Sequence, residues 1–360
     1  MALDSYVSLG RSGLKVSPFG LGTAVFGGKG GSNSSVEESG KILQSYLDRG
    51  GNFIDTANFY TNGHSEKILG DFFARHPGLR DRVVLATKFF GNLHLGDPNG
   101  GGAGRKAVID QLEQSLRRLQ THYIDLYWLH NYDASTPVEE TLRTLDDLVT
   151  AGKIRYVGFS NTPGWFTAQA HTIALLRGWT PIVALEVEYS MLARTVEGEL
   201  VPLAQDAGMG VVPWSPLKNG FLSGKYARHS SGSVGGTRAA TMGMPSDAQY
   251  MVIEALVSVA EEIGASPAAV ALAWLQNRPG VTSILIGARL LDQLETNLTA
   301  FEVTLTPAQI AVLDEVSAPA LNYPAEVVGK YAPMLKYAGA TVNGQQTVVY
   351  PPLLEDPTRY

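Results

Sequence analysis

The segment "NFIDTANFYTNGHSEKILG", residues 52–70, passes from a short apolar strand into an amphipathic helix. Phe53 and Ile54 are typical of a buried strand, and the apolar spacing after the loop is typical of a helix. Asp55 stands at the last position of this strand, and Tyr60 lies in the loop five residues later. A carboxylate and a phenol at such a junction suggest that both side chains face one cavity.

The same strand-then-helix pattern occurs eight times along the chain. The strand segments are apolar at nearly every position, as expected for parallel strands that are covered on both faces. Glycines at 50, 51, 152 and 208 fall just past predicted helix ends, where a left-handed cap favours them. Eight such units predict an α/β fold, a (β/α)₈ TIM barrel, with a doubly wound sheet as the alternative. The predicted strands span residues 19–23, 52–56, 81–89, 123–130, 154–160, 182–189, 209–215 and 283–288.

Three segments exceed a minimal barrel. Residues 6–20 predict an N-terminal hairpin that plugs the bottom of the barrel. Residues 215–250 predict a long Gly/Ser-rich loop after the seventh strand, ahead of a helix at about 248–264, and residues 318–360 form a tail rich in Pro and Tyr. We therefore expect one domain over residues 1–360, with the barrel core at about 19–317.

Composition excludes several classes of protein. The chain has 360 residues, 44% of them hydrophobic, which is enough for a sizeable core. A net charge of −6 argues against nucleic acid or an anionic membrane as the partner. The absence of cysteine excludes disulfides, thiolate zinc sites and a Cys nucleophile. With no signal-peptide pattern and no apolar run near 20 residues, we expect a cytoplasmic protein; the sequence does not define its oligomeric state.

Four ionisable residues stand at or just after the ends of three successive predicted strands: Asp55, Tyr60, Lys88 and His130. In a barrel of this kind, the carboxyl ends of the strands carry the catalytic groups. Alone, each residue has an ordinary explanation as a rim residue, a helix cap or an ion-pair partner. Their coincidence favours a catalytic site at one mouth of the barrel.

These four groups suit the protonation of an oxygen that gains charge when hydride reaches its carbon. A free phenol has a pKa near 10, which is high for a proton donor at neutral pH. An ammonium about 4 Å away contributes roughly 4 kcal/mol at an effective dielectric near 20, so we expect Lys88 to lower the pKa of Tyr60. Asp55 would hold the ammonium, and a neutral His130 would donate a hydrogen bond to the substrate carbonyl. Ester hydrolysis fits poorly, because no nucleophile–base pair is evident.

Four motifs in the expected order, within a match that runs from about residue 7 to 317, resemble the aldo-keto reductase superfamily, in particular its long-chain bacterial members and the related potassium-channel β-subunits. The resemblance implies Asp55, Tyr60, Lys88 and His130 as a catalytic tetrad, with Tyr60 as the general acid in carbonyl reduction. A nucleotide-binding regulatory subunit with little turnover remains the alternative, because the channel-associated relatives share the tetrad. The motifs are "DTANFYTNGHSEKILG" (55–70), "ATKFF" (86–90), "DLYWLH" (125–130) and "GFSN" (158–161).

Hydride transfer requires a nicotinamide cofactor, because no side chain carries hydride. Ser160 and Asn161 supply polar groups suited to a carboxamide, as the family uses them, and Trp214 offers a flat face for the nicotinamide ring. Glu186 stands where the family commonly has Gln; we expect it to accept a hydrogen bond from the carboxamide NH₂. Other candidate cofactor residues are Gly22, Thr23 and Gly287, together with Ser215, Pro216, Leu217, Gly220 and Lys225, which match the family's segment over the pyrophosphate.

Arg289, Gln293 and Asn297 are four residues apart and share one face of a predicted helix near its N-terminus. A guanidinium in a first helical turn would add to the anion preference of the helix end. This favours the 2′-phosphate of NADPH, with NADH still possible. The alternative is a solvated face on which Arg289 pairs with Asp292.

The substrate is expected to be a small carbonyl compound of unspecified class. Phe26, Phe90 and Tyr132 lie just past strand ends and are expected to wall an apolar pocket. No HxH cluster stands at a strand end, so a metal-dependent hydrolase is disfavoured and no metal site is predicted. The tail tyrosines are expected either to fold over the pocket or to pack as a C-terminal clasp: Tyr323, Tyr331 and Tyr337.

Overall fold

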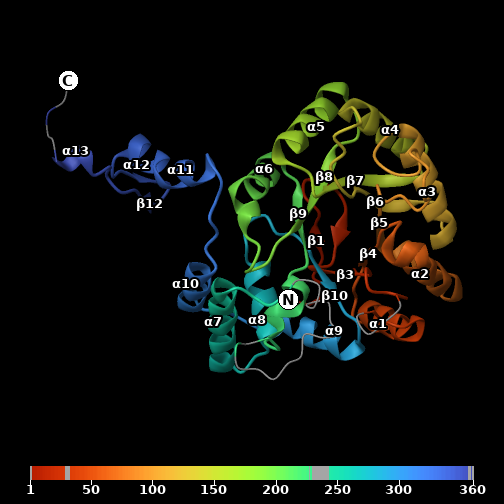
Figure 1. Ribbon diagram of the computed structural model, residues 1–360, viewed down its shortest axis with the longest axis horizontal. Coiled ribbons are helices and arrows are strands. Elements are labelled where there is room, and N and C mark those ends of the chain that lie inside the picture. The colour runs from red at the N-terminus through yellow and green to blue at the C-terminus, as the bar shows by residue number, and fades with distance from the viewer. Residues whose placement is uncertain (1, 29–32, 227, 229–242, 356–357, 359–360) are drawn as a thin grey trace.

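A computed structural model describes residues 2–28, 33–226, 228, 243–355 and 358. Eight parallel strands follow one another in chain order around a barrel, with β10 paired to β3 (Figure 1). A parallel bridge between Val211 and Val281 joins β9 to the segment that leads into β10. The predicted TIM barrel is therefore confirmed, and the doubly wound sheet is not. The barrel strands are β3 (Phe19–Gly22), β4 (Phe53–Asp55), β5 (Val84–Phe89), β6 (Ile124–Leu129), β7 (Ile154–Ser160), β8 (Ile182–Glu188), β9 (Gly210–Trp214) and β10 (Ile284–Gly287).

Helices cover the outside of the barrel (Figure 1). Gly50, Gly152 and Gly208 take the left-handed backbone expected just past helix ends, with φ of +83°, +72° and +71°. The helices are α1 (Val36–Asp48), α2 (His64–Arg75), α3 (Arg105–Leu119), α4 (Val138–Thr150), α5 (Gly164–Arg177), α6 (Leu200–Ala207), α7 (Asp247–Ile263), α8 (Pro267–Gln276), α9 (Leu291–Leu298) and α10 (Pro307–Val316). Short 3₁₀ helices lie at Tyr60–Gly63, Arg80–Arg82, Thr195–Gly198, Lys218–Ser223 and Thr299–Glu302.

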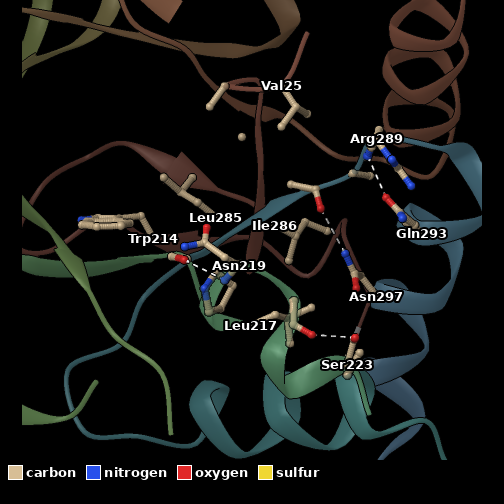
Figure 2. Close-up of a pocket in the computed structure, with 18 of the residues that line it drawn as sticks. Val25, Trp214, Leu217, Asn219, Ser223, Leu285, Ile286, Arg289, Gln293 and Asn297 are labelled. Atoms are coloured by element: carbon tan, nitrogen blue, oxygen red, sulfur yellow. Dashed lines mark hydrogen bonds between the residues drawn. The ribbon is translucent and has the colours of Figure 1, made fainter. Parts of the chain in front are cut away.

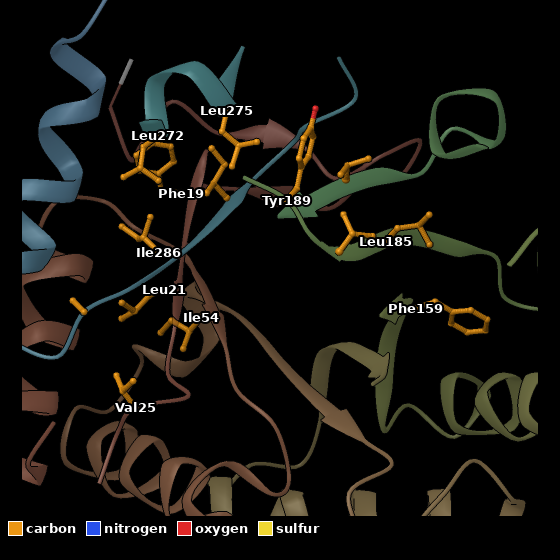
Figure 3. Close-up of a cluster of buried hydrophobic side chains, with 14 of the residues drawn as sticks. Phe19, Leu21, Val25, Ile54, Phe159, Leu185, Tyr189, Leu272, Leu275 and Ile286 are labelled. Carbon is orange, nitrogen blue, oxygen red and sulfur yellow. The ribbon is translucent and has the colours of Figure 1, made fainter. Parts of the chain in front are cut away.

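Strand side chains that point outward form the main core against these helices. Figure 3 shows Phe19 and Ile286, from β3 and β10, on the same side as Leu272 and Leu275 of α8. All four side chains are almost fully buried. No single helix in the described parts of the chain has both the length and the apolar character to cross a bilayer; only α7 and α8 taken together do, across a 99° bend.

The N-terminal hairpin closes the bottom of the barrel as predicted. β1 (Val7–Ser8) pairs antiparallel with β2 (Lys15–Val16). Leu9 and Val16 are fully buried and pack with the inward side chains of the barrel, Phe53 and Trp128 among them. This plug leaves the opposite mouth, where the strands end, for a functional site.

The long loop predicted after the seventh strand follows β9 in the structure. The loop contains the 3₁₀ helix Lys218–Ser223 and ends at α7, while residues 227 and 229–242 lie outside the described residues.

The tail projects away from the barrel (Figure 1), and Tyr323 is 86% exposed. The expectation that the tail covers the pocket or clasps the barrel is therefore wrong. Its elements are α11 (Ala325–Lys330), α12 (Ala332–Tyr337), β11 (Thr341–Val342), β12 (Gln345–Gln346) and α13 (Pro352–Glu355).

Candidate active site

The four predicted catalytic residues lie together at the open mouth of the barrel. Lys88, from β5, donates a hydrogen bond to Asp55 Oδ2 at the end of β4 and another to the Thr56 carbonyl at 3.1 Å. Its Nζ lies 5.2 Å from the centroid of the Tyr60 ring, which is 5.8 Å from the ring of His130. A phenol, an ammonium, a carboxylate and an imidazole are thus brought into one cluster.

The loop that carries Tyr60 is fixed by neighbouring elements. Thr61 adopts a left-handed backbone, with φ of +48°, and its hydroxyl donates to the Phe26 carbonyl at 2.9 Å. The Asn58 amide donates to the Gly91 carbonyl at 2.7 Å and to Gln111 Oε1 at 2.8 Å. These bonds tie the loop to the loop after β3, the loop after β5 and helix α3, so the phenol is held in place before any ligand binds.

Lys88 is fully buried and faces two carboxylates. Besides Asp55, Glu186 of β8 places its Oε2 3.2 Å from Lys88 Nζ. Burial alone lowers the pKa of an ammonium, but the charges of Asp55 and Glu186 outweigh it and raise the pKa of Lys88 above its usual range. Lys88 therefore stays protonated at any physiological pH.

The expected direction of the Tyr60 pKa is wrong for this structure. Burial raises the pKa of Tyr60 above its usual value, and although Lys88 lowers it, the charges of Asp55 and Glu186 act the other way. The motif gave no sign of the second carboxylate or of the depth of burial. The phenol is consequently protonated at neutral pH, which leaves it available as a proton donor.

His130 is neutral, as predicted. Burial, with a smaller contribution from the charge of Lys88, lowers its pKa to about 3. Its Nδ1 is buried and has no hydrogen-bond partner among the described residues. A neutral imidazole that lines a cavity can donate a hydrogen bond to a ligand through the ring nitrogen that carries its proton.

A cavity of about 590 Å³ is lined by Asp55, Tyr60 and His130 of this cluster and extends past Trp214 to the start of α9. Figure 2 shows its part between Trp214 and Arg289. Thr23 and Ser160, also predicted, are fully buried and do not line it. Instead, Thr23 Oγ1 donates to the Asp55 carbonyl at 3.0 Å, and Ser160 Oγ accepts from Asn161 at 3.0 Å. The predicted cofactor residues that line the cavity are Gly22, Asp55, Asn161, Glu186, Trp214, Ser215, Pro216, Leu217, Gly220, Lys225, Gly287, Arg289, Gln293 and Asn297.

The position of Arg289, at the far end of the cavity, differs from the predicted one. Arg289 precedes α9, which begins at Leu291, so its guanidinium does not belong to the first helical turn. Glu38 of α1 accepts a hydrogen bond from the Leu291 backbone N–H at 2.8 Å. A carboxylate thus already occupies one of the amides at this helix N-terminus.

The predicted substrate residues are not brought together. Phe26 is fully buried in the core and Phe90 is partly buried against it; neither lines the cavity. Tyr132 packs on Phe166 and lines a second cavity of about 480 Å³ on another side of Trp214. The predicted apolar wall at Phe26 is therefore wrong, because that ring points into the barrel's outer core.

Phe59 is an aromatic residue that the sequence reasoning missed. Its side chain is 39% exposed, and its ring lies 5.1 Å from that of His130 and 5.4 Å from that of Tyr60. Its position directly before Tyr60 was the only available signal. Residues lining the cavity were also missed after β9 and at the start of α8, among them Asn219, Ser223, Tyr226 and Ser266.

Comparisons with known proteins show which family the sequence matches. The model of the Aldo/keto reductase family matches residues 18–318. An uncharacterized oxidoreductase of Bacillus subtilis (strain 168) is 36% identical over 320 residues, covering 86% of this chain and 95% of that protein. A putative voltage-gated potassium channel subunit beta of Schizosaccharomyces pombe is also 36% identical, covering 86% of this chain and 92% of its own. An aryl-alcohol dehydrogenase (NADP(+)) of Phanerodontia chrysosporium is 34% identical, covering 84% of this chain and 83% of its own.

Proposed function

The chain belongs to the aldo/keto reductase family, and from that premise we propose that it is an NADPH-dependent oxidoreductase that reduces aldehydes or ketones to alcohols. The proposal rests on one observation: a single continuous cavity is lined by different kinds of side chain at its two ends. The Tyr60 and His130 side chains form one end, and Arg289 lies at the other. A phenol and a guanidinium thus line a single elongated cavity, which supports the proposed roles of proton donor and phosphate-binding group.

The residues along this cavity fit a nicotinamide nucleotide. Trp214 offers a ring face, and Gly22 and Gly287 leave space because they carry no side chain. Asn161 and Glu186 present polar groups beside Trp214, and we propose that they contact the carboxamide. Ser160 does not line the cavity, so it would act indirectly, through the hydrogen bond that it accepts from Asn161. The pyrophosphate would lie against the segment from Ser215 to Lys225, and the 2′-phosphate beside Arg289.

NADPH supplies the hydride in this proposal; the protein supplies the proton and the orientation. His130 holds the substrate carbonyl by a hydrogen bond from its neutral ring. Tyr60 donates its phenol proton to the carbonyl oxygen as the new C–H bond forms, so one C–H and one O–H bond replace the C=O π bond. The tyrosinate that remains is stabilised by the charge of Lys88 and regains its proton from water.

Phe59 beside His130 favours an aryl or otherwise apolar carbonyl over a charged one. The test is a screen that follows NADPH consumption over aryl aldehydes, aliphatic aldehydes and sugars, repeated with NADH. We expect turnover with aryl aldehydes and a preference for NADPH. Turnover restricted to charged sugars, or none with either nucleotide, would contradict the proposal.

The alternative is a nucleotide-binding regulatory subunit. It rests on the similarity to the protein named as a putative potassium channel subunit beta. This alternative predicts tight NADPH binding without steady-state turnover on any member of the carbonyl panel. The same screen, paired with a binding measurement, therefore separates the two functions.

A further inference from the structure

The carboxylate of Glu186 takes no part in the proposed transfer of hydride and proton. The side chain is almost fully buried and lines the cavity beside Asn161 and Trp214. Its Oε2 is 3.2 Å from Lys88 Nζ but makes no hydrogen bond with any described residue. A carboxylate buried in the wall of a ligand cavity, with an ion pair to Lys88 but no hydrogen bond, requires an explanation, because burying an ionised oxygen without a hydrogen bond is costly.

The charges around Glu186 do not balance if every acid is ionised. The titratable groups that face it are Asp55, Lys88 and the phenol of Tyr60. The flanking strands β7 and β9 place Ser160 and Val212 at the paired positions, and neither titrates. Two carboxylates against one ammonium would leave a buried net charge of about −1, which a retained proton removes.

That proton belongs on Glu186 rather than on Asp55. Burial raises the pKa of Asp55 as well, but the charge of Lys88 and the direct hydrogen bond from it oppose that rise. Glu186 Oε2 has only the ion pair with Lys88 at 3.2 Å. Burial, reinforced by the charge of Asp55, raises the pKa of Glu186 to about 8, with Lys88 acting in the opposite direction. At neutral pH the cluster is then neutral, with an ionised Asp55, a charged Lys88 and a protonated Glu186.

We propose that Glu186 carries a proton that sets the redox-state preference of the nucleotide site. Protonated, it leaves the site neutral and favours the uncharged reduced nicotinamide. Ionised, it favours the positively charged oxidised ring. This inference rests on the proposed nucleotide site and assigns a proton-linked role to a residue that the transfer of hydride does not require.

The sign of the pH dependence follows from linkage. A positive ring beside Glu186 stabilises its carboxylate, so NADP⁺ binding lowers the pKa of Glu186 and releases a proton to solvent. A bound neutral ring excludes water and keeps the proton in place. As the pH rises through about 8, the affinity for NADP⁺ therefore rises and the affinity for NADPH falls.

The test compares dissociation constants for NADPH and NADP⁺ between about pH 6 and 9.5 by quenching of tryptophan fluorescence. The ratio Kd(NADP⁺)/Kd(NADPH) is the informative quantity, because both nucleotides carry the same titrating 2′-phosphate. We expect this ratio to fall about tenfold in the wild type as the pH rises, and to change less than about twofold in Glu186→Gln. Glu302→Gln, an exposed carboxylate in the 3₁₀ helix Thr299–Glu302, is the control and should behave as the wild type.

A second measurement does not depend on any variant folding correctly. Addition of NADP⁺ to the wild-type protein in weak buffer near pH 7.5, with a pH indicator, should release a fraction of a proton per site. A wild-type ratio that is independent of pH, an unchanged slope in Glu186→Gln, or no proton release would overturn the proposal. If neither nucleotide binds the wild type at all, the proposed function fails as well; if both bind with a flat ratio, only this inference fails.

Discussion

Lys88 is the cation that compensates the buried carboxylates of the site. It is fully buried between Asp55 and Glu186, and it lies 5.2 Å from the centroid of the Tyr60 ring. Removing one partner of such a buried ion pair typically costs about 3–5 kcal/mol, because the remaining charge is left uncompensated. A Lys88 variant would therefore change stability and chemistry together, so substitutions at Tyr60 and Arg289 test individual roles more cleanly.

Arg289→Ala is expected to raise the KM for NADPH about tenfold while leaving the KM for NADH within about twofold. The reason is that a guanidinium–phosphate hydrogen bond is charge-assisted, and only NADPH carries the 2′-phosphate. Steady-state kinetics with both nucleotides give the comparison, and Arg177→Ala, at the remote end of α5, serves as the control. Equal losses for NADPH and NADH would reject the assignment.

At the residue scale, the sequence predicted the position of Asp55, Lys88 and His130 because each stands at or just past the carboxyl end of an apolar strand. Tyr60 was predicted from its place in the loop that follows the strand of Asp55. The sequence could not locate Phe59, since an aromatic residue in a loop has no periodic context. It also misjudged the pKa of Tyr60. That value depends on burial and on Glu186, which is 126 positions away in the chain and adjacent only after the barrel closes.

At the scale of elements, the hairpin plug depends on one backbone position. Gly10 has φ of +57°, and an added Cβ would lie against the Val183 carbonyl oxygen and 2.7 Å from that of Gly208. Gly10→Ala is expected to lower the free energy of unfolding by about 2–3 kcal/mol, because it adds a steric clash to left-handed strain. NADPH affinity should remain unchanged, since the plug lies at the opposite end of the barrel from the cavity.

Gly78→Ala is the matched control. Its φ is +85°, and a Cβ there would meet nothing within 4 Å. It carries the backbone strain without the clash, so a cost near 1 kcal/mol is expected. Chemical denaturation of both variants gives the difference, and equal losses in the two would contradict the role assigned to Gly10.

Two helices, α8 and α10, were not predicted from the apolar pattern of the sequence. Residues 268–275 of α8 are all buried, so the segment has no polar face and no helical period. Its only signal is Ser266 as a cap followed by Pro267. α10 begins similarly, with a capping box formed by Thr306 and Gln309.

At the scale of the whole molecule, the parallel barrel explains why distant residues meet. All eight strands end at one mouth, so Gly22, Asp55, Lys88, Glu186 and Gly287 gather there from positions across the chain. This part of the site follows from the fold once the strands are recognised.

The tail could not be placed in the same way, because aromatic content alone does not determine what a segment packs against. Its apolar side chains, Leu335 and Leu354 for example, are exposed in a part of the chain that extends away from the barrel (Figure 1). The family model ends at residue 318, where the tail begins. The catalytic account therefore rests on the barrel alone.

The central claim is that Tyr60 gives the proton in a reaction whose hydride comes from a nucleotide bound in the adjoining cavity. The most direct measurement is the turnover of Tyr60→Phe with an aryl aldehyde, alongside its dissociation constant for NADPH and with Tyr123→Phe, at the start of β6, as the control. We predict a turnover lower by about 10²–10⁴-fold with NADPH affinity within about twofold of the wild type. Wild-type turnover in Tyr60→Phe would contradict the account.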